Sequence, residues 1–161
     1  STQARSLVAY SLGFGVLSTL SKKLPGFPAG GVVGFSVDSQ GRPIFALSTM
    51  SGHTQDLLQN VEGAPASLTV MAGNFKGAAD GRVTLTGRVI KEKDADTIKS
   101  LRDMYMEKHP EAFWVDFGDF HWFHMTDIQH IRFIGGFGRA GDIKLDEYAQ
   151  SAPDAIMVRR V

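Results

Sequence analysis

The stretch VVGFSVDSQGRPIFALST, residues 32–49, decides the fold class. On either side of Ser39-Gln40-Gly41 the side chains alternate between apolar and small or polar. Alternation with a period of two is typical of a β-strand with one buried face, and a short segment containing glycine is typical of a turn. The stretch therefore predicts a β-hairpin with strands over residues 32–38 and 42–49.

The pattern continues on both sides of this hairpin. Further alternating runs predict strands at residues 14–21, 66–72, 82–92, 121–128 and 129–138. Residues 22–31 contain two prolines and three glycines and predict a loop. Helices are predicted at residues 2–12, after Ser51, and at 94–110, where Asp94 provides the N-cap and Pro110 the end. The order indicates a mainly β (α+β) fold, an antiparallel barrel flanked by helices.

Composition narrows the function classes. The chain has 161 residues with 17 basic and 17 acidic side chains, so it lacks the basic excess of a general nucleic-acid binder. Without cysteine, disulfides, thiolate metal sites and a cysteine nucleophile are excluded. No apolar run is long enough to span a bilayer. We expect one domain over residues 1–161, soluble in the cytoplasm or plastid stroma and not secreted; a removed targeting segment or a further C-terminal domain stays open.

The segment ALSTMSGHTQDLLQN, residues 46–60, gathers polar groups where a strand passes into a helix. Ser48, Thr49, Ser51 and Thr54 supply hydroxyl donors, and His53 supplies an imidazole that titrates near neutral pH. Together with the free N–H groups of a helix start, these side chains could bind a phosphate or carboxylate. The alternative is that Ser51 or Thr54 caps the helix and the other side chains are solvated.

Other candidate groups lie on the predicted strands. His121 and His124 are three residues apart on one strand, so they point to opposite faces and cannot bind one metal ion together. Each could equally be a packed, hydrogen-bonded histidine. Arg82 and Arg88 share one face, and Arg139 follows the glycine-rich FIGGFG; these arginines could bind a carboxylate or phosphate or could be solvated. No nucleotide-binding, zinc or serine-hydrolase motif is present, and no catalytic residue is predicted.

Three segments together resemble a known family. They are ARSLVAYSLGFGVLSTLS (4–21), GFPAGGVVGFSVDSQGRPIFALSTMSGHTQDLLQN (26–60) and HPEAFWVDFGDFHWFHMTDIQHIRFIGGFGRAGDI (109–143). In this order they are similar to the pyridoxamine-phosphate-oxidase-like split barrels, and within them to the branch of HugZ-type haem-degrading proteins and their plant and algal relatives. The GDF and GGFGRA segments are the most specific.

The resemblance implies a homodimer with a ligand cleft at the subunit interface. In flavin-binding members FMN contacts the strand that matches Gly31, Val32 and Val33, and its phosphate contacts the loop that matches residues 48–54. Those oxidases carry an arginine before this strand, where the present chain has glycine, so the resemblance favours haem over FMN. The tail after Asp142 contains no histidine. A protein ligand of the haem iron would then be His53, His109, His121, His124 or His130, or would come from a segment outside this sequence. The resemblance favours His53 and His124 as the candidate haem-iron ligands, with Arg82, Arg88 and Arg139 as candidate partners of the propionates.

Three functions remain open at this stage. The first is haem degradation of the haem oxygenase type, which needs a reductant or electron donor. The second is an FMN-dependent oxidoreductase acting in the same cleft. The third is a non-catalytic regulator that binds a tetrapyrrole.

Overall fold

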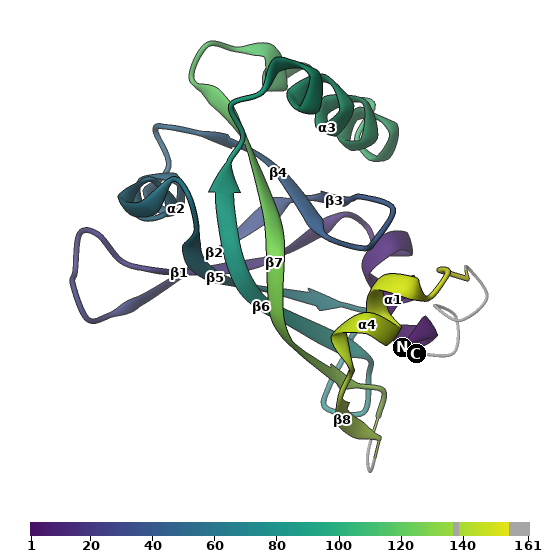
Figure 1. Ribbon diagram of the computed structural model, residues 1–161. Coiled ribbons are helices and arrows are strands. Elements are labelled where there is room, and N and C mark those ends of the chain that lie inside the picture. Colours follow the sequence, from purple (N-terminus) through teal and green to yellow (C-terminus); the bar gives the residue numbers. More distant parts are fainter. Residues whose placement is uncertain (137–138, 155–161) are drawn as a thin grey trace.

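An antiparallel sheet of eight strands, curled into a half-barrel, forms the centre of the molecule (Figure 1). The structure is a computed structural model and describes residues 1–136 and 139–154. Its strands follow the order β2-β1-β5-β6-β7-β4-β3, and β8 pairs with β7. Their bounds are β1 Phe14–Leu20, β2 Pro28–Gly34, β3 Ser36–Val37, β4 Pro43–Ser48, β5 Ala64–Met71, β6 Arg82–Lys91, β7 Phe120–Ile134 and β8 Ala140–Asp142.

The helices lie at the rim and ends of the sheet (Figure 1). They are α1 Thr2–Tyr10, α2 Gly52–Leu57, α3 Ala95–Lys108 and α4 Leu145–Gln150, with short 3-10 helices at Leu58–Asn60 and Phe113–Asp116. None of the helices in this part of the chain is long and apolar enough to cross a membrane. The Asp94 carboxylate accepts a hydrogen bond from the Thr97 backbone N–H, which confirms the predicted N-cap of α3.

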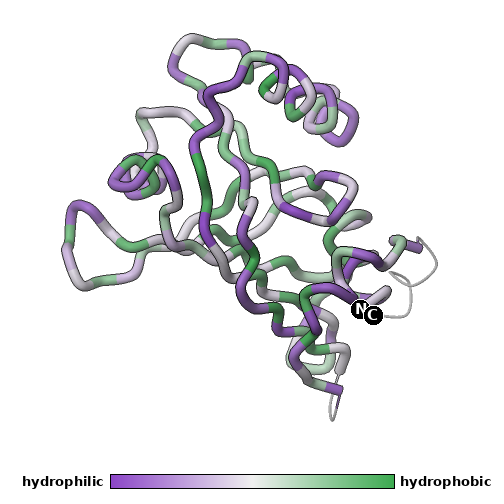
Figure 2. The backbone as a smooth tube through the Cα atoms, in the orientation of Figure 1, coloured by the Kyte–Doolittle hydropathy of each residue, from purple (hydrophilic) through white to green (hydrophobic). Residues whose placement is uncertain are grey.

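Two hydrophobic clusters hold these elements together. The larger fills the inside of the half-barrel, where α1 contributes Leu7 and β7 contributes Phe123 and Met125. The smaller lies under α3 and includes Tyr105 and Trp122. Figure 2 shows the hydrophobic residues concentrated along the strands, whereas α3 is hydrophilic apart from isolated positions. Because β7 has buried residues on both faces from Trp122 to Met125, it belongs to both clusters.

The mainly β fold with flanking helices and an antiparallel split barrel is confirmed, but three details of the sequence prediction are wrong. The predicted loop 22–31 ends in strand β2, which begins at Pro28 and pairs with β1. Proline and glycine misled the prediction because both are tolerated in an edge strand. The predicted strand 32–38 is divided between β2 and the two-residue β3, so the hairpin with β4 is short.

The third error is at the C-terminal end. The two strands predicted at 121–128 and 129–138 form one continuous strand up to Ile134, β7; residues 137 and 138 lie outside the described residues. The long strand bends at a bulge opposite Gly87, so it changes direction without a turn that would divide it into two strands. A methyl group at Gly87 would lie 2.9 Å from Ile128 Cα, which explains the glycine there. Strand β8 and helix α4 were not predicted.

A buried carboxylate organises the β3–β4 hairpin. Asp38 accepts hydrogen bonds from the backbone N–H groups of Gln40 and Arg42 and from Arg42 Nε at 2.7 Å. His124 Nε2 lies 2.8 Å from the same carboxylate and is itself buried. Burial alone would raise the pKa of Asp38, but the hydrogen bonds from His124 and Arg42 outweigh it and lower the pKa to about 2.

This network predicts an acid-dependent contribution to stability. Because the pKa of Asp38 falls from 3.8 to about 2 on folding, the ionised carboxylate should add about 2 kcal/mol to the free energy of unfolding above pH 4. The contribution should be lost as the pH falls toward 2. Urea unfolding of wild type and Asp38→Asn across this pH range checks the prediction. A stability difference between the two proteins that stays constant with pH would contradict it.

Candidate functional site

His53 lies at the centre of the candidate site, on the first turn of α2. The chain leaves β4 at Ser48 and enters α2 at Gly52, which places the imidazole against the edge strand β2. A methyl group added to Gly31 would lie 3.8 Å from His53 Nδ1, an ordinary contact distance, which shows that the ring lies directly beside β2. His53 lines two neighbouring cavities.

The four hydroxyl groups around His53 do not converge on one point. Ser48 Oγ donates to Asp119, and Thr54 Oγ1 is fully buried with no hydrogen-bond partner among the described residues. Ser51 is the N-cap residue of α2, but its side chain makes no capping hydrogen bond. Thr49 is held through its backbone, whose carbonyl accepts from Gln55 Nε2. The loop therefore shows neither predicted arrangement: no side chain caps α2, and the four hydroxyl groups do not form one binding site.

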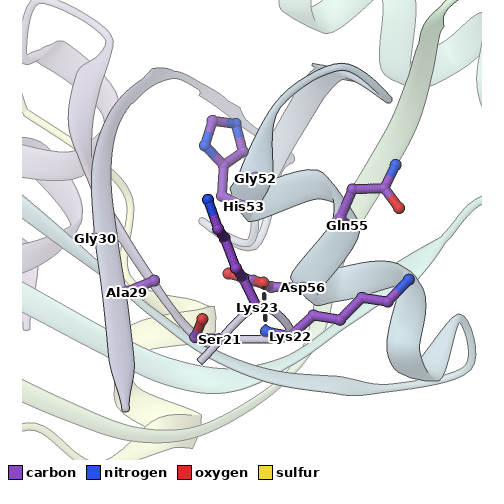
Figure 3. A pocket seen from close by; sticks show the side chains of 9 residues that line it. All are labelled: Ser21, Lys22, Lys23, Ala29, Gly30, Gly52, His53, Gln55 and Asp56. Carbon is purple, nitrogen blue, oxygen red and sulfur yellow. Dashed lines mark hydrogen bonds between the residues drawn. The ribbon is translucent and has the colours of Figure 1, made fainter. Parts of the chain in front are cut away.

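The larger cavity is a polar cleft of about 680 Å³ between the β1–β2 loop, β2 and α2. Its lining residues are Ser21, Lys22, Lys23, Ala29, Gly30, Gly52, His53, Gln55 and Asp56. Figure 3 shows the Lys23 side chain extending toward His53, whereas Lys22 points away from it. The two ammonium groups have no ion pair with the described residues and make the cleft suitable for a carboxylate or phosphate.

Asp56 fixes the wall of this cleft. Its carboxylate accepts from Thr19 Oγ1 at 2.6 Å. It also accepts from the Lys22 backbone N–H at 2.8 Å, the contact that Figure 3 marks with a dashed line. These bonds tie the start of the β1–β2 loop to α2. Since the carboxylate is buried and already has two donors, the charges facing the opening are those of the lysines.

The smaller cavity, of about 180 Å³, has four aromatic residues in its lining, Phe14, Tyr105, Trp114 and Phe120, and is called the aromatic pocket. It lies between β2, β4 and the elements under α3. Its lining residues are Phe14, Val32, Val33, Gly34, Ala46, Leu47, Ser48, Ser51, His53, Tyr105, His109, Trp114 and Phe120. Phe14 and Val32 are 54% and 71% exposed, so this aromatic pocket has a broad apolar rim.

Burial affects the chemistry of His53. Desolvation lowers the pKa of its imidazole, and the nearby Asp56 carboxylate offsets this only in part. The lowered pKa favours the neutral form of the ring. It makes no hydrogen bond with the described residues, so a nitrogen lone pair is available to an iron atom.

The structure brings only some of the predicted site residues together. His53, Ser48, Ser51, Val32 and Val33 line the aromatic pocket, and Gly31 lies against His53. His124 lines neither cavity.

The three arginines lie elsewhere. Arg82 and Arg88 occupy the outward positions of β6, and Arg88 Nη1 donates to the Gly63 carbonyl. Arg82 binds the carbonyls of Ala78 and Asp80, while Arg139 is exposed between β7 and β8.

Sequence reasoning missed several residues of the two cavities. The pair Lys22-Lys23 lay in a segment interpreted only as a loop, although adjacent lysines beside glycines are a visible signal. Tyr105 lies within the helix predicted at residues 94–110, and nothing local shows that its hydroxyl reaches a cavity. Trp114 belongs to a 3-10 helix that was not predicted.

Comparison with known families identifies the fold. Residues 1–150 match the family described as CREG, beta-barrel. The chain belongs to this family. A chloroplastic relative from Arabidopsis thaliana, the non-canonical haem oxygenase HOZ, is 37% identical over an alignment of 148 residues, which covers 88% of this CREG-type barrel and 44% of the plant protein. The barrel thus spans less than half of that relative.

Solved structures agree with this assignment. A haem-binding protein from Mycobacterium smegmatis superposes with a TM-score of 0.85 at 25% identity, covering 98% of this chain and 63% of that protein. HutZ from Vibrio cholerae, described as a haem storage protein, gives 0.61 at 17% identity over 74% of this chain and 84% of HutZ, a likeness of fold. The resemblance seen in the sequence of this CREG-type barrel is confirmed.

The anchoring of the β1–β2 loop can be tested through Asp56. Asp56→Asn should lower the free energy of unfolding by about 2 kcal/mol, because Thr19 Oγ1 and the Lys22 amide lose a charged acceptor. It should also speed hydrogen exchange of the Lys22 amide. Urea unfolding and hydrogen-exchange mass spectrometry measure the two effects. The surface variant Asp103→Asn is the control, and equal behaviour of the two variants would refute the anchoring.

Proposed function

We propose that this CREG-type barrel binds haem beside His53 and degrades it in a reaction of the haem oxygenase type. The observation that carries the proposal is a half-buried imidazole without a hydrogen-bond partner among the described residues, placed between a lysine-containing cleft and an aromatic pocket. An amphipathic pigment with a flat apolar ring and acidic side chains matches these neighbouring surfaces. The names of the plant and mycobacterial relatives support haem as that pigment.

Each group has a separate role in this proposal. His53 binds the iron, Val32 and Val33 contact the ring, and Lys23 receives a carboxylate. When bound, haem supplies an iron centre that activates oxygen, and its own porphyrin ring is opened. The chain's residues hold and orient the ring and exclude water from its apolar side. The reductant comes from a separate electron donor.

A second copy of the chain is part of the proposal. The aromatic pocket alone is smaller than the cavities that enclose whole cofactors, and its rim exposes Phe14 and Val32. A homodimer would cover this rim and enlarge the site. Arg82, Arg88 and Arg139 would then reach the propionates only from the partner chain. In this proposal His124 has a structural role, because it is hydrogen-bonded to Asp38, and it does not bind the iron.

FMN is the competing ligand in the same place, and a non-catalytic tetrapyrrole regulator is the competing role. The lysines of the polar cleft could bind a phosphate, but Gly30 offers no charged side chain at the position where flavin-binding relatives carry arginine. Haem therefore remains the proposed ligand. The plastid stroma or the cytoplasm remains the proposed compartment, the plastid because the plant relative is chloroplastic.

The test is a haemin titration of wild type and His53→Ala. Wild type should give a sharp Soret band, and the variant should bind at least about tenfold more weakly because the iron loses its protein ligand. His130→Ala is the matched control, since His130 is exposed and ion-paired with Asp142. Loss of the Soret band on addition of ascorbate, with formation of a bilin, tests degradation.

Each competing interpretation has its own outcome. A protein that binds FMN with absorption near about 450 nm and does not bind haemin is a flavin protein. Stable haem in the presence of reductant and oxygen indicates the regulator. An unchanged titration for His53→Ala refutes His53 as the ligand.

A further inference from the structure

The aromatic pocket contains a hydroxyl group that the fold leaves without a partner. Tyr105 is 3% exposed, and its Oη makes no hydrogen bond with any residue in the described ranges. The oxygen is not one of the fully enclosed polar atoms that lack a partner among the described residues, so it is accessible from the space of the pocket. The other buried tyrosine, Tyr148, differs, since its Oη donates to the Gly41 carbonyl at 2.7 Å. Tyr105 is therefore a free hydrogen-bond donor at the wall of the pocket.

The position of the hydroxyl is fixed by its surroundings. The Tyr105 ring lies edge-on to Trp122, with centroids 5.5 Å apart, and tilted on His109 at 4.7 Å. His109 is held in turn, because its Nε2 lies 2.7 Å from the Phe35 carbonyl oxygen. The ring cannot swing the hydroxyl toward another partner without breaking these contacts.

The opposite wall of the pocket makes room for this hydroxyl. A methyl group at Gly34 would lie 2.7 Å from Tyr105 Oη, which is closer than atoms in contact approach. Gly34 has an ordinary negative φ, so the backbone conformation does not require glycine there. The glycine instead keeps open the space in front of the hydroxyl.

A second free donor lies in the same lining. Ser51 Oγ has no hydrogen bond with the described residues, and Ser51 and His53 both border the aromatic pocket. Burial, together with the Glu111 carboxylate, raises the pKa of Tyr105 to about 12, so the phenol keeps its proton and can donate. The pocket thus offers donors to an acceptor oxygen.

We propose that Tyr105 Oη donates a hydrogen bond to a propionate carboxylate of the bound haem and so fixes its orientation. This inference rests on the proposed haem binding. Haem's peripheral methyl and vinyl groups carry no acceptor, so its two carboxylates are the matching groups on the porphyrin. Tyr105 is a positioning residue that acts on one carboxylate, while Lys23 at the polar cleft is available to the other.

The experiment compares Tyr105→Phe with wild type in titrations with haemin and with haemin dimethyl ester. Removal of the hydroxyl should weaken haemin binding about tenfold, the loss expected for a hydrogen bond to a charged group. It should change binding of the ester less than about twofold, because the ester lacks the carboxylate charge. Gly34→Ala, which occupies the space in front of the hydroxyl, should also weaken haemin binding.

Thermal unfolding of the ligand-free protein separates this role from a structural one. Tyr105→Phe should be at least as stable as wild type, since the lost hydroxyl had no partner. The matched control Tyr148→Phe should show the reverse, a lower melting temperature and unchanged haemin affinity.

Three outcomes would overturn the inference. They are equal haemin affinity of Tyr105→Phe and wild type, an equal loss for the ester, and a lower melting temperature of ligand-free Tyr105→Phe. Failure of wild type itself to bind haemin would refute the proposed function instead, so the two failures are distinguishable.

Discussion

The candidate site depends on the edge strand β2, which contributes Val32 and Val33 to the aromatic pocket and has a glycine on either side of this pair. A methyl group at Gly34 would lie 2.7 Å from Tyr105 Oη, so glycine there leaves room for the hydroxyl, whereas a methyl group at Gly31 would make only an ordinary contact with His53. Glycine weakens the interior of a strand because it adds no packing and loses more conformational entropy on folding. At the edge of the sheet that cost is small, and β2 is held by its long pairing with β1. The space in front of the Tyr105 hydroxyl thus depends on the missing side chain at Gly34.

Two separate hydrogen-bonded carboxylates hold the scaffold around this space. Asp56 connects α2 to the β1–β2 loop, and Asp38 connects the β3–β4 hairpin to β7 through His124. Each carboxylate is itself buried, so its hydrogen bonds resist solvent competition better than a surface ion pair. His53 in α2 carries no such bond among the described residues, and this difference from His124 in β7 separates a residue available to a ligand from one held in the scaffold.

The sequence predicted elements whose signals are local. Helix α3 combined a capping aspartate, an apolar stripe and a terminating proline, and the β5–β6 hairpin combined two alternating runs with a glycine-rich connection. The same local rules failed for β2, because its prolines and glycines are acceptable only at a sheet edge, and that position is a property of the whole topology. The candidate site could be predicted from the sequence only in part. His53 stood out within a polar segment, whereas Tyr105 comes close to the site only because α3 packs against β7.

Strand β7 has a consequence for how the molecule holds together. Within four consecutive residues it gives Trp122 to the cluster under α3 and Phe123 and Met125 to the interior of the half-barrel. A backbone shared in this way joins the two clusters mechanically, so neither can loosen without disturbing the other. Helix α3 therefore belongs to the same cooperative folding unit as the sheet, although it lies at one end of it.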